Sequence, residues 1–173
     1  MIRQGLIAAI FIITSCGAAS PQSLQEKTGL NAAIGAPPST RDFILAAHET
    51  NLFQQASLKM GTDRGDDRTR ALAKTLSAEG EKRNDSLRDL IQVEKIDVEL
   101  SDESNAGHAN KLGALSGSVG PALVKKFAEL HTEELKDAIA LFQRYVADGE
   151  NLNVRSWAQS QLPGLEKSLA DMK

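Results

Sequence analysis

The fold class is decided by residues 121–149, PALVKKFAELHTEELKDAIALFQRYVADG. Apolar side chains recur in this stretch at steps of three and four residues, which is the spacing of one face of an α-helix. A proline fits the first turn of a helix and a glycine commonly follows the last, so Pro121 and Gly149 mark its two ends. The predicted inward face consists of Leu123, Phe127, Leu130, His131, Ala138, Leu141, Phe142 and Tyr145.

Three further segments carry the same periodicity, over about 40–60, 67–93 and 152–173. Ser39 or Thr40, after Pro37-Pro38, is a good N-cap for the first of them, and Ser39 with Asp42 resembles a capping box. The apolar series of the second is interrupted in its middle at Glu79, Gly80 and Arg83, so that its central layer is predicted to be polar. The last contains Pro163, which predicts a kink because proline lacks a backbone donor.

The stretch from Glu94 to Gly120 is the longest irregular part of the chain, with a short helix predicted from near Ser101 or Asp102. Amphipathic helices become stable by burying their apolar faces against one another. The sequence therefore predicts an all-α, four-helix bundle, up-down-up-down apart from a long connector, 94–120, between the second and third helices. Its expected core includes Leu76, Leu87, Phe127, Phe142 and Leu165.

Composition limits the function classes. The chain has 173 residues, of which 25% are charged and 4% aromatic, and its net charge is −3. A slightly acidic chain without a basic stripe disfavours nucleic acid as a partner. The single cysteine excludes an internal disulfide framework and a cysteine metal cage.

The N-terminus has the layout of a secretory signal, with Arg3 before an apolar run of eight residues, 6–13. That run is too short to span a bilayer as a helix. Ile13-Thr14-Ser15-Cys16 resembles a bacterial lipobox, which implies cleavage before Cys16 and lipid attachment to its sulfur and new amino group. The alternative is an ordinary cleaved signal with a stray cysteine or a free thiol.

These features predict three regions. Residues 1–15 are expected to be a lipoprotein signal peptide, 16–39 the lipidated cysteine with a flexible tether rich in Pro, Gly and Ser, and 40–173 the helical bundle. By resemblance to Gram-negative lipoproteins, Gly17 after the cysteine implies a bacterial envelope location at the outer membrane, facing the periplasm.

Six short motifs occur in a fixed order: FILAA (43–47), NLF (51–53), RALA (70–73), LSG (115–117), ALF (140–142) and QLPGL (161–165). In this order and spacing they resemble the bacterial envelope family called domain of unknown function 4142, whose members are often described as outer-membrane proteins. The resemblance covers about residues 39–172. It implies a ferritin-like helical bundle in secreted or lipid-anchored proteins, with no established activity.

Members of that family usually carry Glu on the first helix, an Asp-His pair on the second and a His on each of the last two. At the corresponding positions this chain has Gln54, Glu79 followed by Gly80, Leu135 and Ser168. The resemblance thus implies that any carboxylate-histidine site of the family is lost in this copy.

The residues themselves offer few chemical groups in a suitable pattern. His131 and Glu134 share a helix face, and Glu79 could lie opposite, which makes these three the candidates for a metal site. The alternative is a core-edge histidine near a carboxylate. His48 and His108 have no second ligand by spacing, and we predict both to be surface residues.

Arg83 leaves two possibilities open. If it faces inward, its guanidinium needs a partner, and Glu79 one turn earlier is the obvious one. A small rotation of the helix would instead place Arg83 in solvent.

Two other patterns bear on possible chemistry. Nothing in the sequence forms a nucleophile elbow, and 61–67 is best explained as a turn capping the second helix.

The sequence therefore predicts a non-enzymatic, lipid-anchored bundle of the envelope that binds the membrane through Cys16 and interacts with a protein or other envelope component. No cofactor and no nucleic acid are expected. The alternative is a ferritin-like metal-binding or redox bundle that uses Glu79, His131 and Glu134.

Overall fold

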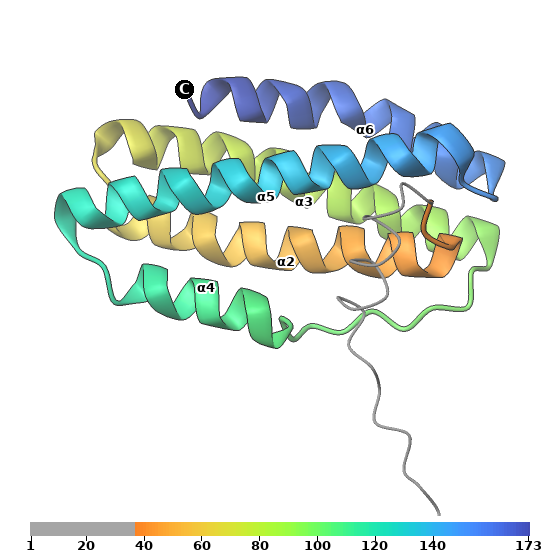
Figure 1. The fold of residues 1–173 in the computed structure, drawn as a ribbon, viewed down its shortest axis with the longest axis horizontal. Helices are drawn as coiled ribbons and strands as arrows, with labels where there is room; N and C mark the ends of the chain where they lie inside the picture. The colour runs from red at the N-terminus through yellow and green to blue at the C-terminus, as the bar shows by residue number, and fades with distance from the viewer. Residues whose placement is uncertain (1–36) are drawn as a thin grey trace, which may run out of the picture.

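The computed structural model describes residues 37–173, and within this range every regular element is an α-helix, which confirms the all-α class (Figure 1). The predicted signal peptide, Cys16 and most of the tether lie outside the described residues. Within residues 37–173, four helices are long and one is short: α2 (Thr40–Arg64), α3 (Asp67–Glu94), α4 (Ala106–Ser116), α5 (Gly120–Asp148) and α6 (Leu152–Asp171).

Side-chain caps fix the helix starts. Ser39 Oγ accepts a hydrogen bond from the backbone N of Asp42 at 3.1 Å, as predicted, and Asp66 caps α3 by accepting from Thr69 N at 2.8 Å. The first helix runs past its predicted end because Gly61 is not a terminator. A Cβ there would lie 2.8 Å from Phe127 Cε2, so the glycine permits close approach of α5.

The short helix begins at Ala106, later than the sequence predicted, because Asn105 is its cap and accepts from His108 N at 2.9 Å. Before it, the connector alternates partly buried and exposed residues, and it packs its apolar side chains on the core of the bundle. The sequence reading missed this alternation at Ile96, Val98 and Leu100.

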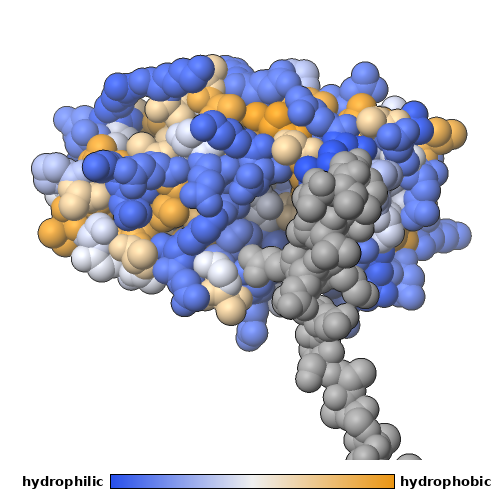
Figure 2. Space-filling view, viewed as in Figure 1, coloured by the Kyte–Doolittle hydropathy of each residue, from blue (hydrophilic) through white to orange (hydrophobic). Residues whose placement is uncertain are grey.

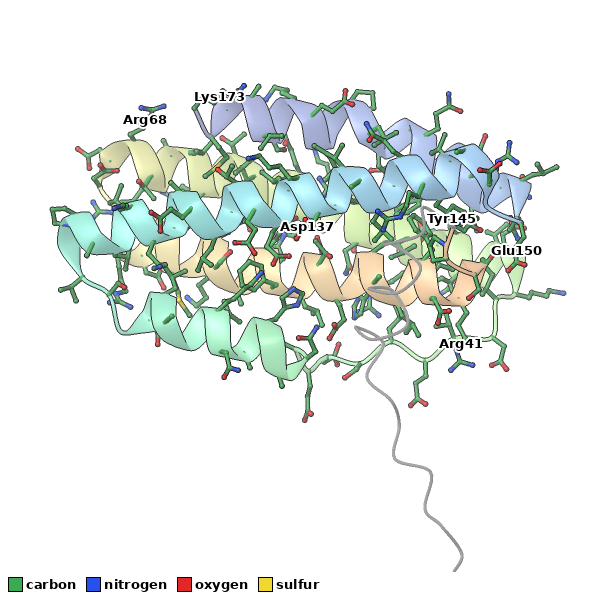
Figure 3. All side chains as sticks on the ribbon, viewed as in Figure 1. Arg41, Arg68, Asp137, Tyr145, Glu150 and Lys173 are labelled. Atoms are coloured by element: carbon green, nitrogen blue, oxygen red, sulfur yellow. The ribbon has the colours of Figure 1, made fainter. Side chains whose placement is uncertain are left out.

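The topology differs from the prediction. α2 packs against α3 and α5, α6 packs against α5 and α3, and α4 lies on α2 and α5 (Figure 1). α5 ends where α2 begins, since Tyr145 Oη lies 2.6 Å from Thr40 Oγ1 and Glu150 accepts from Thr40 N at 3.0 Å. Figure 3 labels Tyr145, Glu150 and Arg41 at this end of the bundle.

α3 ends at the same end of the bundle, because Glu94 accepts from Asn153 Nδ2 at 2.9 Å. α3 and α5 therefore run in the same direction, and the predicted up-down-up-down order is wrong. The physical reason is the connector, which runs back along the bundle with α4 in it, so that α5 starts at the end where α2 finished.

All five predicted core residues are buried: Leu76, Leu87, Phe127, Phe142 and Leu165. The rings of Phe43, Phe142, Tyr145 and Trp157 gather near the start of α2, with Phe43 and Tyr145 stacked at 4.1 Å between ring centroids. α6 continues as one helix through the exposed Pro163. Among residues 37–173, no helix combines the length and apolarity that crossing a bilayer requires.

Candidate functional site

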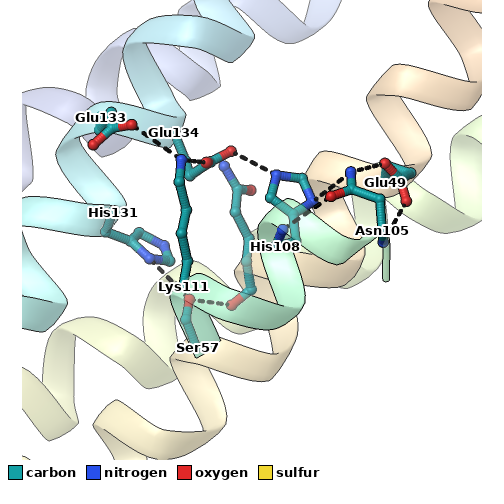
Figure 4. A network of polar contacts seen from close by, with 9 residues as sticks. Glu49, Ser57, Asn105, His108, Lys111, His131, Glu133 and Glu134 are labelled. Carbon is teal, nitrogen blue, oxygen red and sulfur yellow. Dashed lines mark hydrogen bonds and ion pairs between the residues drawn. The ribbon is translucent and has the colours of Figure 1, made fainter. Parts of the chain in front are cut away.

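A buried carboxylate is the centre of a polar cluster that joins α4 to α5. Glu134 of α5 is 4% exposed, and it receives Lys111 Nζ at 2.6 Å and His108 Nε2 at 3.3 Å from α4 (Figure 4). Burial alone would raise the pKa of Glu134, but hydrogen bonds and charge from His108 and Lys111 outweigh it and hold that pKa below its ordinary value. The carboxylate is therefore ionised and already paired.

Further contacts hold the middle and the start of α4. Lys111 Nζ also lies 3.0 Å from Glu133, and the two carboxylates together raise the pKa of Lys111 against the opposing effect of burial. On the other side, Glu49 of α2 accepts from Asn105 N at 2.9 Å and from Asn105 Nδ2. We name Glu49, Asn105, His108, Lys111, Glu133 and Glu134 the clamp cluster.

Both histidines predicted to be surface residues are buried, and that prediction was wrong. His48 is 1% exposed, with Nε2 2.8 Å from the carbonyl oxygen of Ser101 and Nδ1 3.3 Å from Asn84 Oδ1. His108 is 8% exposed and packs its ring on Phe53, with 4.8 Å between centroids. The connector and α4 fold back over α2 and bury both rings. The spacing of residues along the sequence does not indicate this tertiary contact.

Ser57 and His131 form a buried pair, with Ser57 Oγ 3.1 Å from His131 Nδ1. With the hydrogen of the serine hydroxyl assigned to the Gln54 carbonyl, 2.9 Å away, Nδ1 of His131 is the donor to Ser57. Burial, against the opposing charge of Glu134, lowers the pKa of His131 to about 4, so the ring is neutral at pH 7. A general base would face the hydroxyl with an unprotonated nitrogen, and this geometry is the reverse.

A second polar layer joins α2, α3 and α6. Arg83 Nη1 donates to Gln54 Oε1 at 3.4 Å, and Ser168 Oγ lies 3.2 Å from Glu79 Oε2. Arg83 is half-buried, and its hydrogen-bond partner is Gln54 rather than Glu79. Burial lowers the pKa of Arg83, although the charge of Glu79 opposes this. Arg83 thus faces the interior, and the predicted neighbour acts on it through charge.

The candidate metal residues are not brought together. Glu79 contacts Ser168 and Lys167 on α6, Glu134 contacts α4, and His131 contacts Ser57. Over the described range no group of three or more His, Cys, Asp or Glu side chains is arranged to hold a metal ion. The metal-binding alternative is therefore not supported by this arrangement.

Three surface hollows on the described part of the molecule are lined by residues other than Ser57, His131 and Glu134. One of them, of 660 Å³, lies between α2 and α3 and has both lysines and carboxylates on its walls. Hydrophilic residues dominate the face seen in Figure 2, interrupted by small apolar groups. These three hollows thus do not reach the Ser57–His131 pair or Glu134.

Sequence reasoning missed most of the clamp cluster. Lys111, Asn105 and Glu49 lie on three segments whose spacing in the chain gives no reason to connect them. One local signal was present, because an asparagine three residues before His108 is a good helix cap. It would have placed α4 correctly and turned attention to His108.

Comparison with protein families gives one finding: a family model described as Domain of unknown function (DUF4142) matches residues 25–173. No curated protein and no solved structure matches the chain. The match includes the five helices described in 37–173, and with them the clamp cluster and the Arg83 layer. The chain therefore belongs to the domain of unknown function 4142 (DUF4142) family.

Proposed function

We propose that this chain is a non-enzymatic, lipid-anchored helical-bundle protein of the bacterial envelope, placed at the outer membrane and facing the periplasm. The observation that carries the proposal is the position of the only cysteine, Cys16, as the last residue of Ile13-Thr14-Ser15-Cys16. Two or more acyl chains hold a soluble domain firmly on a membrane, whereas one binds marginally.

The absence of an enzymatic role is proposed from how the interior polar groups are used. Glu134 is paired with Lys111 and contacts His108, and the hydroxyl of Ser57 next to His131 donates to the carbonyl oxygen of Gln54. Each of these groups is occupied by a structural contact. Function would then reside on the surface, in contacts with a protein or other envelope component.

We further propose that the four long helices form a ferritin-like four-helix bundle. Support comes from the contact order, in which α2, α3, α6 and α5 each pack on two neighbours in turn. The single long crossover between α3 and α5 is also typical of ferritin-like folds.

The anchor is tested with two variants of the full chain in a Gram-negative host. Cys16→Ala is expected to lose metabolic labelling by fatty acid and to leave the membrane fraction. Gly17→Asp keeps the acceptor cysteine, and it is expected to stay labelled while moving to the inner membrane. Membrane retention of unlabelled Cys16→Ala would contradict the proposal.

A further inference from the structure

α4 is attached to the molecule in a different way from the other helices. Only His108 and Leu115 of its 11 residues are buried, whereas α5 buries side chains along its whole length. Leu115 is fully buried and packs in a cluster with Leu58 and Phe127. One aliphatic side chain and one imidazole ring therefore supply the buried side-chain packing of α4.

Polar contacts supply the rest of the attachment. They form three groups, one at the start of α4, one in its middle and one just after its end. At the start, Glu49 accepts from Asn105, and after the end Arg64 donates to the carbonyl oxygens of Ser116, at 2.9 Å, and Ser118. In the middle, Lys111 and His108 meet Glu134. Each of these polar contacts replaces hydrogen bonds to water, so its net stabilisation of the closed state is small, and somewhat larger where a charged group takes part.

Glu134 links α4 to the bundle. The carboxylate belongs to α5, whereas Lys111 and His108, which contact it, belong to α4. When α4 lies in place, the carboxylate loses water and depends on Lys111 and His108. If α4 moves away, water can replace them at little cost to the bundle. The closed state is therefore sensitive to a single side chain, Lys111.

α4 also has little helix stability of its own. Isolated helices shorter than about 12–15 residues are marginal in water. Its Gly113 lowers that stability further, and a Cβ at this position would meet nothing within 4 Å. Residues 95–105 before it and 117–119 after it have no regular helix.

We infer that α4 is a detachable strap, which opens as one unit while α2, α3, α5 and α6 stay folded, with Glu134 and Lys111 as its clamp. Opening uncovers the ring of Phe53, the cluster around Leu58 and Phe127, and the carboxylate of Glu134. This inference does not depend on the lipid anchor.

The test is amide hydrogen exchange of the full chain, followed by mass spectrometry of peptides covering 106–116, α2 and α5. In the unmodified chain, peptides from 106–116 should exchange faster than the buried parts of α2 and α5. Lys111→Met should speed exchange of 106–116 by about 10-fold or more, because it leaves a buried carboxylate with one partner fewer. Gly113→Ala should slow it by about five-fold through helix propensity alone.

Lys125→Met is the matched control, since Lys125 is an exposed lysine of α5 paired with Glu129, and it should leave exchange of 106–116 unchanged. Equal protection of α4 and the buried parts of α2 and α5 would overturn the strap. So would Lys111→Met accelerating all helices equally, or Gly113→Ala leaving 106–116 unchanged.

Discussion

Arg83 of α3 and Gln54 of α2 meet inside the bundle, with Nη1 of the arginine 3.4 Å from Oε1 of the glutamine. This contact lies at the break in the apolar series of α3, where the sequence predicted a polar layer. Nearby on α2, Gln54 Nε2 and Asn51 Oδ1 are buried without a hydrogen-bond partner among the described residues. The layer is thus only partly satisfied, which lowers what it contributes to stability.

The two partners of this contact are expected to be coupled in a double-mutant cycle. Gln54→Leu leaves a half-buried guanidinium without its acceptor, and should lower the free energy of unfolding by roughly 1–3 kcal/mol. Arg83→Met leaves Oε1 of Gln54, which is 4% exposed, without its donor, and should lower that free energy by a similar amount. The double variant leaves neither group unpaired and should lose clearly less than the sum of the two single losses. Urea unfolding followed by circular dichroism measures all three variants, and additive losses would show that the two side chains are not coupled.

His131 predicts a pH dependence of stability. Unfolded, its imidazole takes up a proton near pH 6.5, whereas burial lowers the pKa of the folded residue to about 4. Between these values the unfolded state binds more protons, so the free energy of unfolding should fall by about 3 kcal/mol as pH drops from 6.5 to 4. Unfolding curves across this pH range measure the slope.

His131→Phe is the control, because phenylalanine keeps a ring next to Phe127 and cannot titrate. The slope between pH 6.5 and 4 should largely disappear in this variant. Glu134 acts in a separate window, since its lowered folded pKa means that its stabilisation is lost only below its unfolded value of 4.5. A slope that survives in His131→Phe would assign the effect to another group.

The core prediction compares a buried and an exposed aliphatic residue. Leu165 is 1% exposed, and Leu165→Ala should cost about 2–5 kcal/mol of unfolding free energy. Val93 is 75% exposed, and Val93→Ala should change it by less than about 0.5 kcal/mol. Thermal and denaturant unfolding measure both changes. Equal losses in the two variants would contradict the burial of Leu165 in the core.

Lys95 ends α3 in the left-handed region, with φ of 52°. A glycine relieves the clash between Cβ and the backbone there, so Lys95→Gly should raise the free energy of unfolding by up to about 1 kcal/mol. Lys95→Ala keeps the Cβ and serves as the control, with no gain expected. A loss of stability in Lys95→Gly would mean that the lysine side chain contributes more than the backbone strain costs.

The sequence predicted the helices well because each carries its own periodic apolar face and a local cap such as Ser39 or Asp66. It failed where long-range packing decides. Gly61 continues α2 instead of ending it because Phe127 approaches from α5. The direction of α5 depends on the path of the connector, which has no periodic signal.

The candidate site was predictable only in part, for the same reason. The polar layer of α3 was visible as a gap at Glu79, Gly80 and Arg83, but its partners Gln54 and Ser168 come from other helices. His108 was assigned to the surface because spacing within α4 shows no partner. Its partner Glu134 lies on the next helix, across a turn that sequence spacing alone does not place.

The most direct test of the account is the mass of the N-terminal peptide of the protein purified from membranes. The account predicts a chain that begins at Cys16, with a diacylglycerol on its sulfur and an acyl chain on its amino group. A mature chain that begins at another residue, or that carries Cys16 as an unmodified thiol, would contradict it.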